Sequence, residues 1–218
     1  MFKTYKPYFT QILRLSYPII IGQIGIVLMG VADVVMIGNI NATNLAAAGL
    51  ANSVYFLVSI IGIGTLSAVS AIVAKAKGAG HSNETAILFG QSIWASLALS
   101  VFVSSVLLVL TFNLEWFGQS EEVTLLTKSY LHILNAGTVF MLLFTGIKQF
   151  SDGLSITKPS AVITIAGLLL NVFLNWVLIY GKFGFPRLEL DGAGYATSFT
   201  RLIMALAMFV YIIKGSIY

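Results

Sequence analysis

The sequence predicts an all-α integral membrane protein with six transmembrane helices. Of its 218 residues, 58% are hydrophobic and 9% are charged, and the mean hydropathy is +0.93. A soluble domain carries about 25% charged residues, so these values exclude ordinary water-soluble folds. Each membrane-spanning helix needs about 20 apolar residues, and six such helices with short loops account for the whole length.

Three apolar segments divide the first half of the chain. No charged residue lies between Asp33 and Lys75, and the polar residues at 39–44 interrupt this stretch. This pattern predicts one helix over about residues 15–37 and a second over about 45–73. A loop rich in lysine and glycine follows, and the next apolar run predicts a third helix over about residues 86–112.

Three further helices are predicted in the second half. An acidic loop over residues 113–122 precedes a fourth helix at about 123–147. Proline is accepted in a first helical turn, so Pro159 opens a fifth helix over about residues 159–180. The run 181–192 is rich in glycine, proline and charge, and a sixth helix follows at about 193–213. We assign residues 1–218 to a single domain.

The distribution of basic residues predicts the orientation. With a cytoplasmic N-terminus, most lysines and arginines fall on the inner side, and only Lys128, Lys182 and Arg187 fall on the outer side. This bias obeys the positive-inside rule, and an even number of helices places both termini in the cytoplasm. Because the basic residues are scattered between apolar segments, we expect membrane lipid as a partner and no nucleic acid.

Asp33 is the only acidic residue within the predicted helices. A carboxylate in the hydrocarbon costs about 2.5 to 3.5 kcal/mol, so such residues usually face a cavity and serve a function. The alternative is that Asp33 lies near enough to the outer end of its helix to be wetted. We favour the functional interpretation.

Three polar residues lie at depths similar to that of Asp33. With a rise of 1.5 Å per residue, Asp33 and Thr197 lie about 6 Å, Asn175 about 8 Å and Asn171 about 13 Å from the outer helix ends. A carboxylate, two amides and a hydroxyl suit a hard cation, and the carboxylate could instead take up a proton. The alternative for the asparagines and the threonine is hydrogen bonding between helices.

Other residues leave two interpretations open. Pro18 either kinks the first helix or begins it, and Gln23 is a candidate for a polar cavity. Arg201 either pairs with Asp33 or extends outward to the interface. Phe144 is expected to face lipid rather than a cavity. The sequence lacks cysteine, a Walker loop and a Ser-His-Asp set, so we expect neither an enzyme nor a cofactor.

Several motifs, in order along most of the chain, resemble the multidrug and toxic compound extrusion (MATE) family and its NorM-like branch. They are Ser16-Tyr17-Pro18, Ala32-Asp33, Leu45-Ala46-Ala47, Gly78-Ala79-Gly80, Lys148-Gln149-Phe150-Ser151-Asp152-Gly153, Thr157-Lys158-Pro159, Asn171-Val172-Phe173-Leu174-Asn175-Trp176 and Gly192-Ala193-Gly194-Tyr195-Ala196-Thr197.

This resemblance implies an antiporter of the cell's inner (plasma) membrane that exports amphipathic, often cationic drugs and dyes against Na⁺ or H⁺. It implies ion binding by Asp33 and Asn171, with Thr197 beside them and Pro18 as a point of helix bending. One branch of the family has an aspartate where this chain has Asn175. The asparagine favours either Na⁺, held by Asp33, Asn171 and Asn175, or a single proton on Asp33.

The resemblance covers only the first of the family's two six-helix lobes. It therefore implies a second lobe as a partner, either a missing C-terminal half or a second copy of the chain. Two alternatives are a relative that flips lipid-linked precursors and a six-helix fragment or subunit that does not transport by itself.

Overall fold

The computed structural model describes residues 2–80 and 82–215, and the side chains of residues 12–80 and 83–215. Seven α-helices and one short 3₁₀ turn, Leu114–Phe117, make up this part of the chain. The helices are α1 (Phe2–Gly38), α2 (Ala42–Gly78), α3 (Ser82–Phe112), α4 (Glu121–Ala136), α5 (Thr138–Gly153), α6 (Lys158–Tyr180) and α7 (Glu189–Lys214). Five of them are long and apolar enough to cross a membrane, and the bent pair of α4 and α5 is a sixth candidate if it is counted as one span.

The fourth predicted helix, residues 123–147, differs from the structure because two helices take its place. The axes of α4 and α5 meet at 43° around Gly137. A β-carbon at this position would lie 2.5 Å from the hydroxyl oxygen of Ser198 on α7, so the glycine lets α7 lie close to the bend. Hydropathy does not register such a break, because both segments are apolar.

Most helices are longer than their apolar runs. Predicted residues 15–37 lie inside α1, which begins at Phe2, and predicted residues 45–73 lie inside α2, which begins at Ala42. Pro18 is therefore in the interior of a helix and does not begin it. The sixth predicted helix, 193–213, is extended to Glu189 at its start. The polar ends of these helices remain helical beyond the apolar segments from which the boundaries were predicted.

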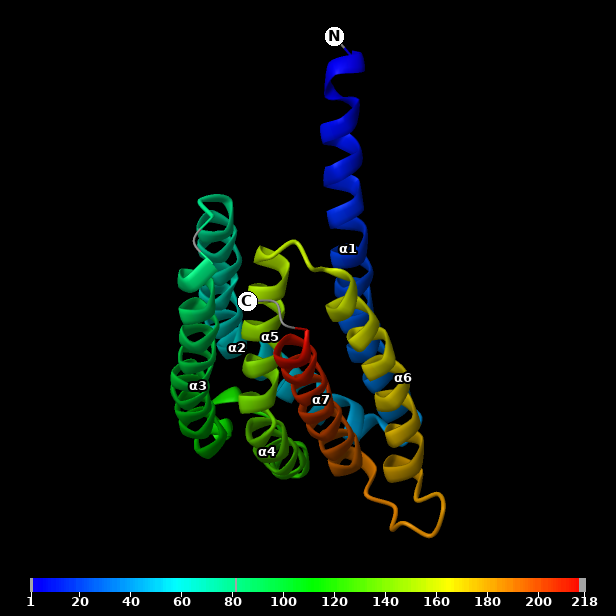
Figure 1. Cartoon of the computed structure of the whole chain (residues 1–218). Coiled ribbons are helices and arrows are strands. Elements are labelled where there is room, and N and C mark those ends of the chain that lie inside the picture. Colours follow the sequence, from blue (N-terminus) through cyan, green and yellow to red (C-terminus); the bar gives the residue numbers. More distant parts are fainter. Residues whose placement is uncertain (1, 81, 216–218) are drawn as a thin grey trace.

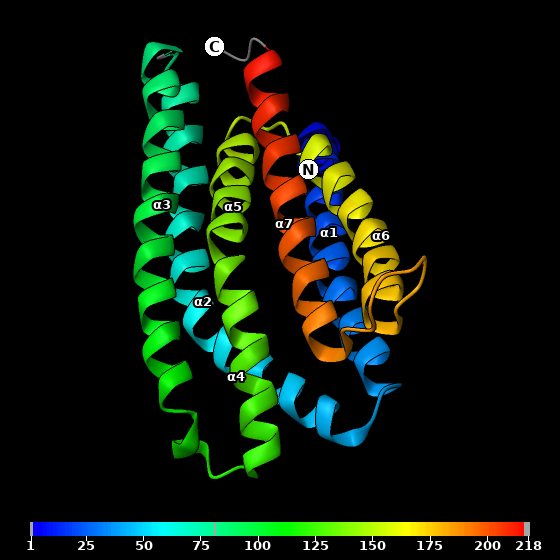
Figure 2. The same cartoon turned by 90° about the horizontal axis from the view of Figure 1, so that it is seen from below.

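The helices form two groups that meet along α5 and α7. In one group α2, α3 and the bent pair α4–α5 pack together, and in the other α1, α6 and α7 do so. Figure 2 shows both groups from below, with α7 lying between α5 and α1. The N-terminal half of α1 extends beyond the other helices in Figure 1.

Small residues allow α1 to approach α6 closely. A β-carbon at Gly25 would lie 3.1 Å from the methyl group of Thr164, and one at Gly22 would lie 3.5 Å from the backbone of Ala161. Glycines are favoured at such contacts because they let two helix backbones come together. Further along α1, the same approach places Asp33 against α6.

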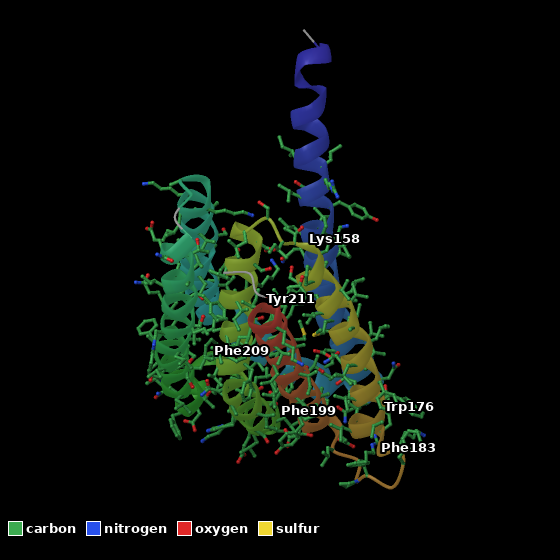
Figure 3. All side chains as sticks on the ribbon, viewed as in Figure 1. Lys158, Trp176, Phe183, Phe199, Phe209 and Tyr211 are labelled. Carbon is green, nitrogen blue, oxygen red and sulfur yellow. The ribbon has the colours of Figure 1, made fainter. Side chains whose placement is uncertain are left out.

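Many large apolar side chains are exposed on the outer surface of the bundle, as expected for helices that face lipid. Trp176 and Phe183 are exposed and lie near the connection between α6 and α7, with ring centroids 5.6 Å apart. Figure 3 shows this aromatic pair at one end of the bundle and Lys158 toward the other. Aromatic residues at one boundary and lysine at another are typical of spanning helices.

Candidate functional site

Asp33 is the centre of a buried cluster of hydrogen bonds between three helices. This residue lies on α1 and is 6% exposed. One carboxylate oxygen, Oδ1, accepts a hydrogen bond from Nδ2 of Asn175 on α6 at 2.5 Å. The other, Oδ2, accepts one from the hydroxyl of Thr197 on α7 at 3.0 Å. Each carboxylate oxygen therefore has a neutral donor.

Asn171 completes this cluster by bonding to both partners of Asp33. Its Oδ1 accepts from Asn175 Nδ2 at 3.1 Å, and its Nδ2 donates to Thr197 Oγ1 at 3.2 Å. Asn171 and Asn175 are four residues apart and so lie on one face of α6. The structure thus brings together the four residues for which the sequence predicted ion binding. We call Asp33, Asn171, Asn175 and Thr197 the Asp33 cluster.

The charge of Asp33 has no counterion among the described side chains, because no described lysine or arginine forms an ion pair with it. In addition, Oδ1 of Asn175 is buried and has no hydrogen-bond partner. Rotation of this amide about its Cβ–Cγ bond exchanges its nitrogen and oxygen, which would present the oxygen to a cation beside Asp33. Oxygens of carboxylate, amide and hydroxyl groups are the ligands that hard cations prefer.

A cavity of about 440 Å³ adjoins the Asp33 cluster. Asp33 and Thr197 are part of its wall, whereas Asn171 and Asn175 lie outside the lining. Much of the remaining wall is aliphatic or aromatic, with Ile26, Met29, Leu134, Met141, Phe144 and Met204 among its residues. A cavity of this size, mostly apolar and with a few polar groups, is typical of sites for drug-sized molecules.

Three residues outside the Asp33 cluster occupy places that the sequence left open. Gln23 lines the cavity, whereas Pro18 is buried in α1 and lines a separate surface pocket. Phe144 was expected to face lipid, but it is 5% exposed and lines the cavity. The bend between α4 and α5 accompanies this placement, and hydropathy does not indicate such a bend.

Sequence reasoning missed two polar contacts at this cavity. Arg201 neither pairs with Asp33 nor extends to the interface, since its Nη1 donates to the hydroxyl of Tyr55 at 2.8 Å. Lys148 lines the cavity and forms an ion pair with Asp152 at 2.7 Å. The spacing of Lys148 and Asp152, four residues apart in one helix, is a signal that could have revealed the second contact.

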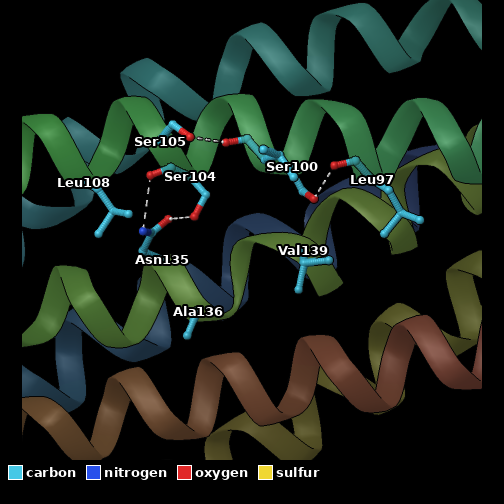
Figure 4. Close-up of a pocket in the computed structure, with 9 residues that line it drawn as sticks. Leu97, Ser100, Ser104, Ser105, Leu108, Asn135, Ala136 and Val139 are labelled. Carbon is cyan, nitrogen blue, oxygen red and sulfur yellow. Dashed lines mark hydrogen bonds between the residues drawn. The ribbon is translucent and has the colours of Figure 1, made fainter.

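A second pocket of about 400 Å³ lies between α3 and the bend of α4 and α5. Figure 4 shows that its polar side chains bond to the protein itself. Ser104 donates to Asn135 Oδ1 at 2.8 Å, and Asn135 Nδ2 donates to the Ser104 carbonyl at 3.3 Å. Because these polar groups already bond to each other, fewer of them are available to a ligand here than in the cavity beside Asp33.

Comparisons with known proteins agree with the fold and the resemblance. A family model described as MatE matches residues 18–177. The multidrug resistance protein NorM of Vibrio cholerae is 34% identical over 211 residues, which cover 97% of this chain and 46% of the relative. The multidrug resistance protein MdtK of Photorhabdus laumondii is 33% identical over 94% of this chain and 45% of its own length.

Solved structures show the same architecture. A MATE crystal structure in the bent conformation superposes with a TM-score of 0.86 at 24% identity, covering 94% of this chain and 46% of that one. The eukaryotic MATE transporter AtDTX14 gives a TM-score of 0.87 at 17% identity over 97% and 47%. The chain thus spans a little under half the length of the relatives that it matches.

Proposed function

Because the chain belongs to the MatE family of multidrug and toxic compound extrusion transporters, we propose that it is the ion-binding lobe of a cation-coupled drug antiporter. The family is one of multi-pass membrane transporters and not of enzymes. The exported molecules would be amphipathic, often cationic drugs and dyes, and the driving ion would be Na⁺ or H⁺. The membrane would be the plasma membrane, with both termini in the cytoplasm.

The observation that carries this proposal is a buried carboxylate, without a counterion among the described side chains, beside a drug-sized cavity. Asp33 belongs to the Asp33 cluster and also lines the cavity. A cation held by Asp33, Asn171 and Asn175 would neutralise this carboxylate, and a cationic drug in the cavity would be attracted to the same charge. Ion and drug would therefore compete, which is the requirement for exchange of one for the other.

A second six-helix lobe would complete the transporter. Alternating access in such transporters works by movement of one repeat against the other around the binding site. The matched relatives are about twice as long as this chain, which supports a second lobe of similar size as the partner. Residues 1–218 would act as one unit in this movement, and Pro18, in the interior of α1, would allow that helix to bend.

Dye efflux from liposomes with imposed ion gradients tests the proposal. The protein is reconstituted in three forms: the unmodified chain, Asp33→Asn, and Glu115→Gln as a control that removes an exposed carboxylate outside the Asp33 cluster. Each is reconstituted alone and together with a separately expressed C-terminal lobe of V. cholerae NorM. We expect efflux to follow one gradient, Na⁺ or H⁺, in the unmodified and Glu115→Gln forms and to be lost in Asp33→Asn.

The outcomes separate the alternatives. Equal efflux by Asp33→Asn would remove this carboxylate from the mechanism. Efflux only with the added lobe would identify the chain as one half of a transporter, whereas efflux by the chain alone would identify a working half-size protein. No efflux in either setting from correctly inserted protein would favour a subunit without a transport cycle.

A further inference from the structure

Arg201 places a guanidinium in the wall of the cavity that contains Asp33. It lies on α7, four residues after Thr197, and lines the cavity. Tyr55 on α2 contacts this guanidinium in two ways. The guanidinium carbon is 5.0 Å from the centroid of the Tyr55 ring, and Nη1 donates a hydrogen bond to the Tyr55 hydroxyl at 2.8 Å. Tyr55 is fixed in turn by a contact of 3.2 Å to the Thr138 hydroxyl.

Two basic residues are among the described residues of the cavity wall, and they differ in whether a described carboxylate pairs with them. Lys148 is balanced by Asp152 at 2.7 Å. Arg201 forms no ion pair with any described acidic side chain, and its one side-chain bond, to Tyr55, uses one of the five N–H donors of a guanidinium. The remaining donors suit a planar anion such as a carboxylate, which arginine binds in a bidentate manner.

The cavity therefore contains one carboxylate and one guanidinium that attract each other without touching. The cavity wall also offers apolar side chains, with Met29, Phe144 and Met204 as examples. A molecule that complements this wall has an apolar body, a cationic group and an anionic group. A purely cationic molecule would be attracted by Asp33 but would leave Arg201 without a partner, so it should bind less tightly than a molecule that carries both groups.

We propose that this cavity selects zwitterionic amphiphiles, with the anionic group of the molecule on Arg201 and its cationic group toward Asp33. The proposal rests on the proposed function, because the cationic group takes the place of the coupling ion at Asp33. It assigns to Arg201 and Tyr55 a role in substrate selection. The coupling ion and a zwitterion would compete for Asp33, whereas the coupling ion would not compete for Arg201.

Two dyes with one skeleton provide the test. Rhodamine B carries a cationic xanthene and a free benzoate, and its ethyl ester keeps the cation but lacks the negative charge. Fluorescence polarisation measures binding of each dye to the purified 218-residue chain in lipid nanodiscs without Na⁺, corrected for empty nanodiscs. We expect the unmodified chain to bind rhodamine B more tightly than the ester.

Substitution of the arginine should remove this preference. Arg201→Gln is expected to weaken rhodamine B binding by about tenfold or more, the usual effect of losing a hydrogen-bonded charge. Ester binding should stay equal or improve, because a like charge is removed. Arg187→Gln is the matched control, since it removes an exposed guanidinium outside the cavity. Tyr55→Phe, which keeps the ring but not the hydroxyl, should weaken rhodamine B binding to a smaller extent.

Equal affinity of the unmodified chain for the two dyes, or binding of neither, would overturn the proposal. So would an equal loss of both dyes in Arg201→Gln and Tyr55→Phe, which would show that Arg201 only supports the fold. Ion binding, measured in the same nanodiscs with Asp33→Asn, is a separate result. Absence of ion binding with an intact preference for rhodamine B would contradict the coupling mechanism and leave the selection by Arg201 in place.

Discussion

Two carboxylates of this bundle, Asp33 and Asp152, are both largely shielded from solvent but differ in the groups that contact them. The Asp152 side chain is 7% exposed and pairs with Lys148 at 2.7 Å, and Ser160 on α6 lies 3.4 Å from its other oxygen. Asp33 is 6% exposed, and its partners are an amide and a hydroxyl. The charge of Asp152 is balanced within the chain, whereas the charge of Asp33 is balanced by no described side chain.

The difference indicates which carboxylate can take up a cation from outside. A carboxylate that already has a lysine gains little from another cation, and its pair stabilises the connection between α5 and α6. A carboxylate held only by neutral donors keeps its attraction for a cation. We therefore expect the partners of each oxygen, and not low exposure alone, to distinguish an ion site. Four substitutions test this distinction.

The largest effect on stability is expected from Asp152→Asn. The change leaves the ammonium of Lys148 buried without a counterion, which typically costs about 3 to 5 kcal/mol. Thermal unfolding of the purified protein should therefore show a strongly lowered midpoint, while stabilisation by the coupling ion persists. The double variant Lys148→Met with Asp152→Leu should recover most of the loss. An unchanged midpoint in the single variant would show that the pair is not structural.

Asp33→Asn should have the opposite profile. It removes a buried charge and keeps a side chain of the same shape, so the free energy of unfolding without ions should change by less than about 1 kcal/mol. The stabilisation by whichever cation binds the unmodified chain, about 2.7 kcal/mol at a hundredfold excess over Kd, should disappear. Unfolding in NaCl, in choline chloride and at two pH values measures both effects. A retained response to the ion would place its site elsewhere.

The sequence predicted the Asp33 cluster better than it predicted the cavity. Asp33, Asn175 and Thr197 could be brought together by counting residues from helix ends, because helix rise converts sequence position into depth. Depth does not specify which helices are neighbours or which way a side chain points around its helix. The contact between Arg201 and Tyr55, 146 residues apart, therefore could not be predicted from spacing.

The fold shows the same division. Apolar runs predicted where the chain crosses the membrane, because hydrocarbon excludes polar residues over a fixed length. The bend at Gly137 was missed because the close approach of Ser198 to this glycine comes from another helix and leaves no pattern in the local sequence. In the sequence alone, a glycine between two apolar segments does not indicate a bend. The placement of Phe144 in the cavity wall was missed for a related reason.

Asn175→Leu is expected to weaken ion binding by about tenfold, since it removes one oxygen ligand worth roughly 1.4 kcal/mol. Asn135→Leu is the matched control, because Asn135 is also a buried amide but bonds to Ser104 in the second pocket. It should leave the affinity for the ion unchanged. Titration of the ion against thermal stability yields both affinities. Equal affinities in the two variants would show that the Asn175 amide does not bind the ion.

The smallest effect is expected from the hydroxyl of Thr197 beside Asp33, and the hydroxyl of Ser160 beside Asp152 provides the comparison. Thr197→Val removes a donor 3.0 Å from Asp33 and should weaken ion binding by about threefold, because a single neutral hydroxyl contributes less than a charged or amide ligand. Thr197→Ser should restore the affinity. Ser160→Ala, at 3.4 Å from Asp152, should leave ion binding unchanged. Only groups that contact Asp33 should affect the affinity for the ion. An equal change of affinity in Ser160→Ala and Thr197→Val would therefore contradict the distinction between the two carboxylates.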